Sequence, residues 1–175
     1  MQFLAIFAFC AACVAVLIVV HEAGHYLAGL AAGVPTDDMR IRLLRFPQHV
    51  ELRDSGEWVS PASDVKRYTD LVWRHLKSGP RVYVYVSGGL ILETVFTVCV
   101  SLALIASGHS RIGLAVAGLS LMMALPWLII DGISVCRGRA SGDLSGLWFL
   151  ARAPTVVLLV VFLATRGAIL WYGLA

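Results

Sequence analysis

The sequence predicts an all-α polytopic membrane protein with about four transmembrane helices. A small cytoplasmic β-hairpin and an amphipathic helix are expected between the first and second of these. Of the 175 residues, 59% are hydrophobic and only 14% are charged, against ~25% charged in an ordinary soluble domain. Sixteen of the 25 charged residues fall between Pro35 and Arg81. Sixteen glycines and six prolines without a low-complexity tract exclude a disordered or collagen-like chain, so we expect residues 1–175 to form a single domain in a bilayer.

Four apolar stretches surround the polar segment and supply the predicted spans. They cover roughly residues 3–32, 82–106, 112–134 and 154–175. Each can cross the ~30 Å hydrocarbon layer as a helix, because that needs about 20 residues. The chain begins without a positively charged region and its apolar run continues beyond any sensible cleavage point. We therefore expect the first helix to be retained in the protein.

The distribution of arginine and lysine predicts the orientation of these spans. The first and third connections carry most of the basic residues, whereas the second holds only Arg111. By the positive-inside rule the first and third connections, including residues 35–81, are cytoplasmic and both termini lie on the outer side. The net charge of +3 is too small and too dispersed for a nucleic-acid surface. We expect a multi-pass protein of a bacterial cytoplasmic membrane. The lipid bilayer is an expected partner, and nucleic acid is not.

The polar segment has two parts with different patterns. Residues 39–58 alternate locally between apolar and polar side chains, and Asp54-Ser55-Gly56-Glu57 has turn chemistry, which predicts short strands or a hairpin. Pro61 then opens an amphipathic helix with Ser63 as its expected N-cap. The alternative is a solvated connection that only joins two spans.

A metal-site signature lies within the first span. His21 and His25 are four residues apart, so both imidazoles lie on one helical face and can bind one Zn²⁺, with Glu22 beside them to act on water. Burying three such side chains in an apolar helix costs several kcal/mol unless a partner compensates. The alternative is a pair of satisfied core histidines, which this cost disfavours.

A catalytic zinc site needs a third protein ligand. The candidates by residue type are Asp131, Glu93, His109, His75 and Cys136. His21 and Asp131 each lie eighteen residues along parallel helices, about 27 Å from the outer face. Glu93, about 17 Å from the cytoplasmic face on an antiparallel helix, is expected to lie away from the site. These depths favour Asp131 as the third ligand; its alternative role is a helix-cap carboxylate.

Two further charged residues lie inside the predicted spans. Glu93 and Arg166 are at matching depths, about 17 and 18 Å from the cytoplasmic face, which predicts a structural ion pair between the second and fourth helices. The alternative for Arg166 is snorkelling to the outer interface.

These motifs resemble those of the site-2 proteases, intramembrane zinc metalloproteases with a histidine-glutamate-x-x-histidine helix and a later aspartate-glycine motif. Here the motifs are residues 21–25 and 126–132. The sequence Ser87-Gly88-Gly89-Leu90 is similar to the family's alanine-glycine-proline-leucine motif, and Met123 occupies the position of a usual asparagine. The resemblance implies cleavage of membrane-anchored proteins within or near their transmembrane segments, one Zn²⁺ per chain, and a membrane-associated β element.

Taken together, the residues predict a mechanism and a substrate site. With Zn²⁺ held by His21, His25 and Asp131, Glu22 would take a proton from water and deliver it to the leaving nitrogen.

The substrate, a membrane-spanning protein helix, must unwind before cleavage. The strand-like segment, at Ile41 and Leu43, is expected to hold it by β-augmentation. Gly88 and Gly89 are expected either to line the substrate site or simply to pack helices together. A regulatory membrane partner or a second copy of the chain is a further possible partner.

Two other functions fit parts of the pattern. One is a zinc-binding membrane scaffold or chaperone without turnover, against which the intact Glu22 argues. The other is a different membrane zinc hydrolase acting at the cytoplasmic face, against which the motif at Asp131 argues.

Overall fold

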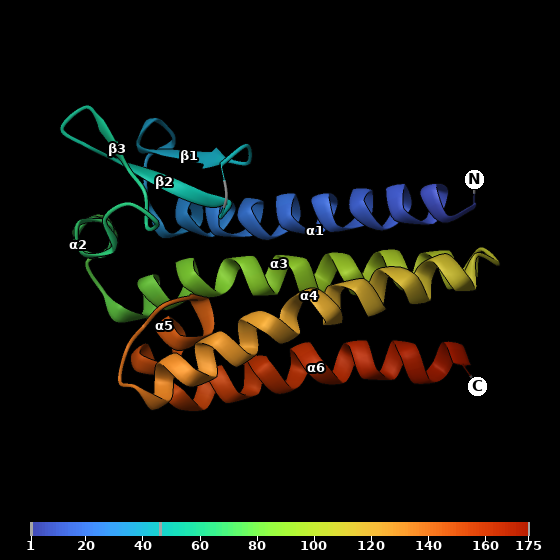
Figure 1. The fold of residues 1–175 in the computed structure, drawn as a ribbon. Coiled ribbons are helices and arrows are strands. Elements are labelled where there is room, and N and C mark those ends of the chain that lie inside the picture. The colour runs from blue at the N-terminus through green and yellow to red at the C-terminus, as the bar shows by residue number, and fades with distance from the viewer. Residues whose placement is uncertain (1, 46, 175) are drawn as a thin grey trace.

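The computed structural model describes the chain over residues 2–45 and 47–174, with a helical bundle and a small sheet at one end of it (Figure 1). The elements in chain order are α1 (Gln2–Ala32), a 3₁₀ turn (Thr36–Asp38), β1 (Met39–Arg42), β2 (His49–Asp54), β3 (Glu57–Val59), α2 (Val65–Leu76), α3 (Gly79–Ala106), α4 (Ser110–Cys136), α5 (Asp143–Leu150) and α6 (Arg152–Leu174).

Four of the described helices, α1, α3, α4 and α6, are long and apolar enough to cross a membrane. This confirms the predicted number of long apolar helices; the last residue of the predicted fourth span, Ala175, lies outside the described residues. The four run side by side, with both chain ends at one end of the bundle and the sheet and α2 at the other (Figure 1). Helix α3 is central, because it packs against α1, α4 and α6. Large apolar side chains such as Phe3, Phe7 and Trp171 are exposed on the outside, as a lipid-facing surface requires.

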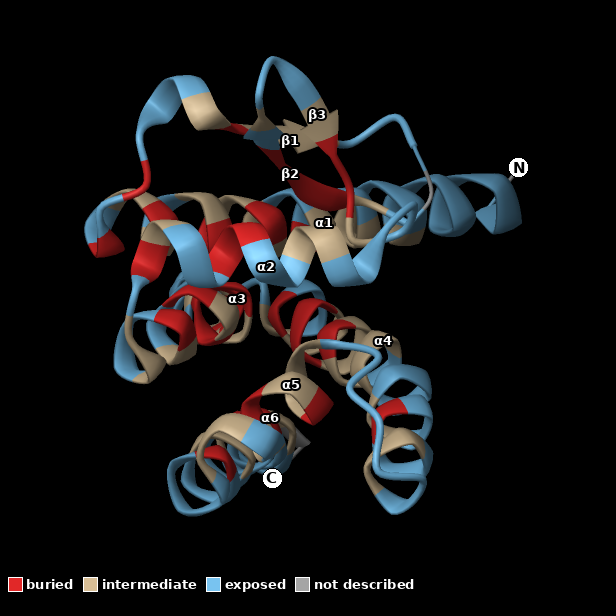
Figure 2. Cartoon of the chain, turned by 90° about the vertical axis from the view of Figure 1, so that its left-hand side faces the viewer, coloured by how far each residue is buried: buried red, intermediate tan, exposed pale blue. Residues whose placement is uncertain are grey.

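Helix α5 is an element that the sequence does not predict. The connection after α4 turns back and forms an eight-residue helix that packs against α3, α4 and α6. In the end-on view of Figure 2, α5 lies in the middle, with α3 above it and α4 and α6 on either side. Ser145 and Leu147 are fully buried there. Two helical turns are too short to produce a clear apolar period, so the sequence pattern resembles an ordinary loop.

The polar segment forms a three-stranded antiparallel sheet in the order β1-β2-β3, one strand more than the predicted hairpin. The predicted turn at residues 54–57 is confirmed and joins β2 to β3. Ser55 and Gly56 have φ values of 52° and 93°, the left-handed conformation that both central residues of a two-residue hairpin turn adopt.

Helix α2 is present as predicted but begins later, with Asp64 rather than Ser63 as its N-cap. The Arg67 backbone N–H donates to the Asp64 carboxylate over 3.0 Å. Asp54 at the end of β2 accepts hydrogen bonds from Arg67 Nε (2.8 Å) and Arg74 Nη1 (2.9 Å), which tie α2 to the sheet. The Arg67 guanidinium holds the pKa of the Asp54 carboxyl below its usual value.

The bundle depends on a close approach of α1 and α3. A Cβ atom added at Gly88 would lie 2.5 Å from both Ala28 Cβ and the Gly24 carbonyl oxygen, and one added at Gly24 would overlap the Gly88 backbone. Small residues permit helix backbones to approach this closely. Gly88 is therefore a packing residue between α1 and α3, which is the alternative role considered for it from the sequence.

Substituting Gly88→Ala should destabilise the protein by about 1–3 kcal/mol, because the added methyl group forces α1 and α3 apart. Reversible unfolding of the purified protein in detergent measures this effect. The matched control is Gly118→Ala on α4, where the nearest atom to an added Cβ is Leu170 Cδ2 at 3.9 Å; this variant should be at least as stable as the wild type. Equal stability of the two variants would contradict the close approach.

Candidate metal centre

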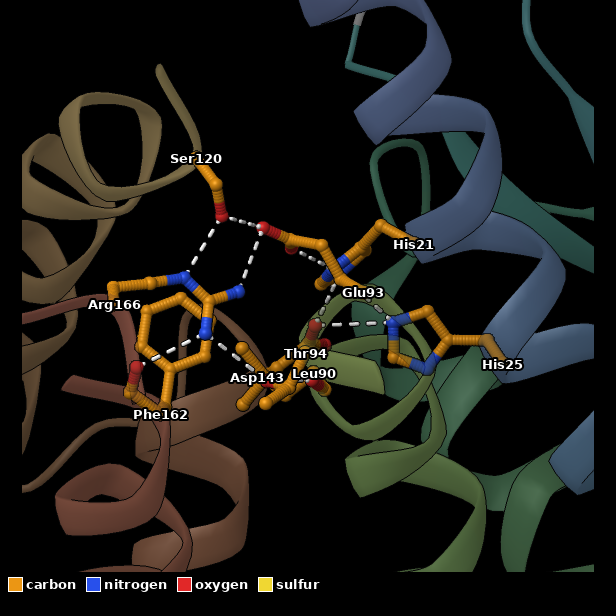
Figure 3. Close-up of polar contacts among 9 residues, drawn as sticks. All are labelled: His21, His25, Leu90, Glu93, Thr94, Ser120, Asp143, Phe162 and Arg166. Atoms are coloured by element: carbon orange, nitrogen blue, oxygen red, sulfur yellow. Dashed lines mark hydrogen bonds and ion pairs between the residues drawn. The ribbon is translucent and has the colours of Figure 1, made fainter. Parts of the chain in front are cut away.

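Three ligand atoms from different parts of the chain converge at one point. His21 Nε2 and His25 Nε2 lie 3.2 Å apart, and each is 3.0 Å from Asp143 Oδ2 (Figure 3). A tetrahedral zinc ion with ligands at ~2.0–2.1 Å separates those ligands by about 3.3 Å. The three atoms therefore already have the spacing of one face of a zinc coordination shell.

The outer nitrogens of both imidazoles are held by hydrogen bonds. His25 Nδ1 lies 3.1 Å from the backbone carbonyl of Tyr85, and His21 Nδ1 lies 3.1 Å from Glu93 Oε2. A carbonyl oxygen only accepts, as does an ionised carboxylate, so each Nδ1 carries the proton. In the neutral rings this leaves an unshared electron pair on each Nε2, the tautomer that binds a metal.

With both rings neutral, the two Nε2 atoms and the Asp143 carboxylate are three acceptors that face one another, and a cation would satisfy all of them. Gly89 adds to the fit: a Cβ at this position would lie 2.5 Å from His25 Nε2 and 2.8 Å from His21 Nε2. The missing side chain leaves the space beside both nitrogens open. Two imidazoles, one carboxylate and an open position are the donor set of hydrolytic zinc sites, so these residues fit zinc.

The predicted third ligand, Asp131, is not part of this group, and Asp143 occupies that place. Asp131 Oδ2 accepts hydrogen bonds from the backbone N–H groups of Leu144 (2.9 Å) and Ser145 (3.2 Å), and Oδ1 accepts from Ser145 Oγ (3.0 Å). Asp131 is therefore a cap for the first turn of α5, the other role considered for it. By holding α5 it fixes the position of Asp143, the first residue of that helix.

The depth argument is wrong for two reasons that the helix ends make clear. Helix α4 continues to Cys136, so Asp131 is only about 8 Å from its end, and the chain then returns to the histidines through α5. Measured from the same end of the bundle, Glu93 is about 21 Å from the start of α3 at Gly79 and His21 is about 17 Å from the end of α1 at Ala32, whereas the prediction set a depth from the outer face against a depth from the cytoplasmic face. Glu93 consequently contacts the site instead of lying away from it.

A cavity of about 740 Å³ opens onto the three ligand atoms. Glu22 lines it, is only 8% exposed, and makes no hydrogen bond to the described residues. The opposite walls carry apolar side chains from α4, α5 and α6: Trp127, Leu128, Phe149, Leu158 and Phe162. The centre therefore combines an unpaired carboxylate with an apolar chamber.

The predicted substrate residues on the sheet do not line this cavity. Ile41 lies opposite Val50 on the edge strand β1, and Leu43 follows the end of β1. In this part of the chain the cavity is lined instead by residues 47–50, which lead into β2 and form its first two positions. Of the other residues considered as ligands, His109 and Cys136 are exposed, and His75 lies outside the cavity lining.

Comparisons of the chain with protein-family models, with curated proteins and with solved structures gave no match. The geometry of the centre and the chemistry of its residues therefore carry the functional proposal.

The variants Asp143→Asn and Asp131→Asn should separate a ligand from a capping residue. Asp143→Asn removes a charged ligand atom and should reduce zinc affinity well beyond the ~10–100-fold typical of losing an outer partner. Asp131→Asn keeps one acceptor for α5 and should remain within that smaller range. Zinc content after dialysis and competition with a chelator measure both; the reverse order would contradict the assignment of Asp143.

Proposed function

We propose that the protein is a zinc-dependent intramembrane endopeptidase of the site-2 protease type, which cleaves membrane-anchored proteins within or near their transmembrane segments. The observation that carries this proposal is the convergence of His21, His25 and Asp143 beside Glu22, at an apolar cavity among four long apolar helices. The distribution of arginine and lysine favours a cytoplasmic position for the sheet and α2. The location that fits is a bacterial cytoplasmic membrane, with both termini on the outer side.

Zinc held by these three residues would polarise the scissile carbonyl and lower the pKa of water. Glu22 then supplies the proton chemistry. Glu22 follows His21 directly in α1 and lines the cavity, and its carboxylate makes no hydrogen bond to another described residue. It is free to take the proton of the attacking water and to deliver it to the leaving nitrogen.

The cavity suits an unwound apolar segment together with water. Its ~740 Å³ far exceeds the ~30 Å³ that one water molecule occupies. Trp127, Phe149 and Phe162 provide contacts for apolar side chains, and His21, His25 and Asp143 provide a polar group in the same cavity. A substrate helix must expose a carbonyl to this group, so its own backbone hydrogen bonds must first open.

Strand β2 offers a backbone edge for holding such an opened segment. Strand β3 pairs only with Leu52–Asp54, whereas β1 pairs with β2 from Leu52 back to His49. Residues 49–51 therefore have a strand partner on one side only within the described sheet. Residues 47–50 line the cavity, so the open side of β2 is a better site for β-augmentation than the outer edge of β1.

The register shows which backbone groups face this open side. In a two-residue hairpin the residues that flank the turn, Asp54 and Glu57, form a hydrogen-bonded pair. Hydrogen-bonding direction alternates along a strand, so the N–H and C=O groups of Leu52 and Val50 point the same way as those of Asp54. Val50 thus presents its backbone to the cavity side, whereas Ile41 presents its own to the outer side of β1.

Proline substitutions at Val50 and Ile41 test which strand edge holds the substrate. Each change removes one backbone donor that does not pair β1 with β2. Val50→Pro should lower cleavage several-fold with zinc retained, and Ile41→Pro should have little effect. Both are measured with a panel of single-span membrane proteins in liposomes. Loss of cleavage in Ile41→Pro alone would place the substrate on β1, and unchanged cleavage in both would exclude augmentation.

Glu22→Gln tests the proposed general base. It should lower cleavage by about 10²–10⁴-fold while zinc binding is retained, because proton transfer is lost and the ligands are intact. The matched control is Glu57→Gln, an exposed carboxylate on β3, which should leave both properties unchanged. A wild-type protein that binds zinc but cleaves no substrate in the panel would support the scaffold alternative, and full activity in Glu22→Gln would remove Glu22 from the mechanism.

A further inference from the structure

A buried polar network adjoins His21 on the Nδ1 side of its ring and reaches the cavity at Glu93. It joins Glu93 on α3, Ser120 on α4 and Arg166 on α6 (Figure 3). Arg166 is completely buried. A charged group in this position is costly unless its partners compensate, so the contacts that surround it are informative about its role.

We propose that Glu93 and Arg166 are positioning residues for the metal centre: Arg166 holds the Glu93 carboxylate, and Glu93 holds His21 in the metal-binding tautomer. The proposal rests on the zinc centre of the proposed function and not on peptide cleavage. It extends the ion pair predicted from the sequence, which on its own would only join two helices.

The two oxygens of Glu93 face different partners. Oε2 accepts the hydrogen bond from His21 Nδ1, while Oε1 accepts from Ser120 Oγ over 2.7 Å and lies 3.4 Å from Arg166 Nη2. Only an ionised carboxylate accepts on both sides at once. The charge on Arg166 therefore favours the form of Glu93 that can keep the proton on His21 Nδ1 and leave Nε2 free.

The guanidinium of Arg166 is fixed by contacts from three helices. Its Nε donates to Ser120 Oγ (2.9 Å), and its Nη1 donates to the Phe162 carbonyl (2.9 Å) and to Thr94 Oγ1 (3.3 Å). The Phe162 ring lies 3.5 Å from its central carbon. With so many partners Arg166 has one orientation, and the position of Glu93 follows from it.

The two histidine ligands differ in what controls them. His25 is held by the backbone carbonyl of Tyr85, which no side-chain substitution removes. His21 depends on the Glu93 side chain, and through it on Arg166. Helix α6 therefore acts on the metal centre although none of its residues is among the three ligands.

The first test is Glu93→Gln in the full chain, purified in detergent. Glutamine replaces one of the two carboxylate oxygens with an NH₂ donor, so the side chain can no longer accept from His21 on one atom and from Arg166 on the other. Zinc affinity, measured by competition with a chelator, should fall about 10–100-fold. The visible absorption spectrum of the Co²⁺-loaded protein should also change, because it reports the ligand geometry.

A double-mutant cycle tests whether Arg166 acts through Glu93. Arg166→Gln should weaken zinc binding, and Arg166→Lys, which keeps the charge, should restore part of it. The double variant Glu93→Gln/Arg166→Gln should lose no more zinc affinity than Glu93→Gln alone, because one path is interrupted twice. Fully additive losses would overturn the action of Arg166 through Glu93.

Two further variants separate positioning from general stability. Thr97 lies one turn from Glu93 on α3, and its buried hydroxyl has no hydrogen bond to the described residues. The variant Thr97→Val removes this hydroxyl and should leave zinc affinity unchanged. Ser120→Ala is a milder change should the charge variants fail to fold, and it should still lower zinc affinity. If Glu93→Gln and Ser120→Ala lower the unfolding temperature but leave zinc affinity and the Co²⁺ spectrum unchanged, the network is structural only. Zinc binding without cleavage by the wild type would overturn the proposed function and not this inference.

Discussion

The hydrogen bonds to the outer nitrogens of His21 and His25 are the constraint on which the rest of the centre depends. They place a proton on each Nδ1, which in the neutral rings leaves both Nε2 atoms, next to Asp143, free to bind a metal. Both bonds come from α3, so they form only when α1 and α3 are in close contact. Gly24 and Gly88 make that contact possible, and the same approach brings Gly89 beside the imidazoles without a side chain to obstruct them. Helix packing and ligand chemistry are therefore parts of one arrangement.

A second layer of carboxylates organises the remaining side of the centre. Asp131 holds the first turn of α5, which carries Asp143, and Glu93 holds His21. Neither carboxylate is among the three proposed ligands. Each is itself held by hydroxyl or guanidinium donors, Ser145 for Asp131 and Ser120 with Arg166 for Glu93. This arrangement satisfies charges that would otherwise be costly to bury, and it limits the freedom of two ligands before any metal binds.

The arrangement of the cavity agrees with hydrolysis of an apolar chain segment. The polar ligand group and Glu22 form one wall, apolar side chains of α4, α5 and α6 form another, and the start of β2 adds a backbone edge. These three parts correspond to the three requirements of the proposed hydrolysis: proton transfer, contact with apolar side chains, and control of an unwound backbone. They come from separate segments of the chain, and α5 contributes to two of them because it supplies Asp143 as well as part of the apolar wall.

The sequence alone determined the features that depend on neighbouring residues. Hydropathy over some twenty positions specified four long helices, the spacing of His21 and His25 placed both on one helical face, and turn chemistry specified the β2–β3 connection. Tertiary structure alone decided which distant groups meet. Asp143 instead of Asp131 joins the two histidines, Glu93 contacts His21, and residues 47–50 line the cavity. The reason is physical. A short helix such as α5 has little periodicity of its own, and the level of a residue within a bundle depends on where every helix begins and ends, which packing sets.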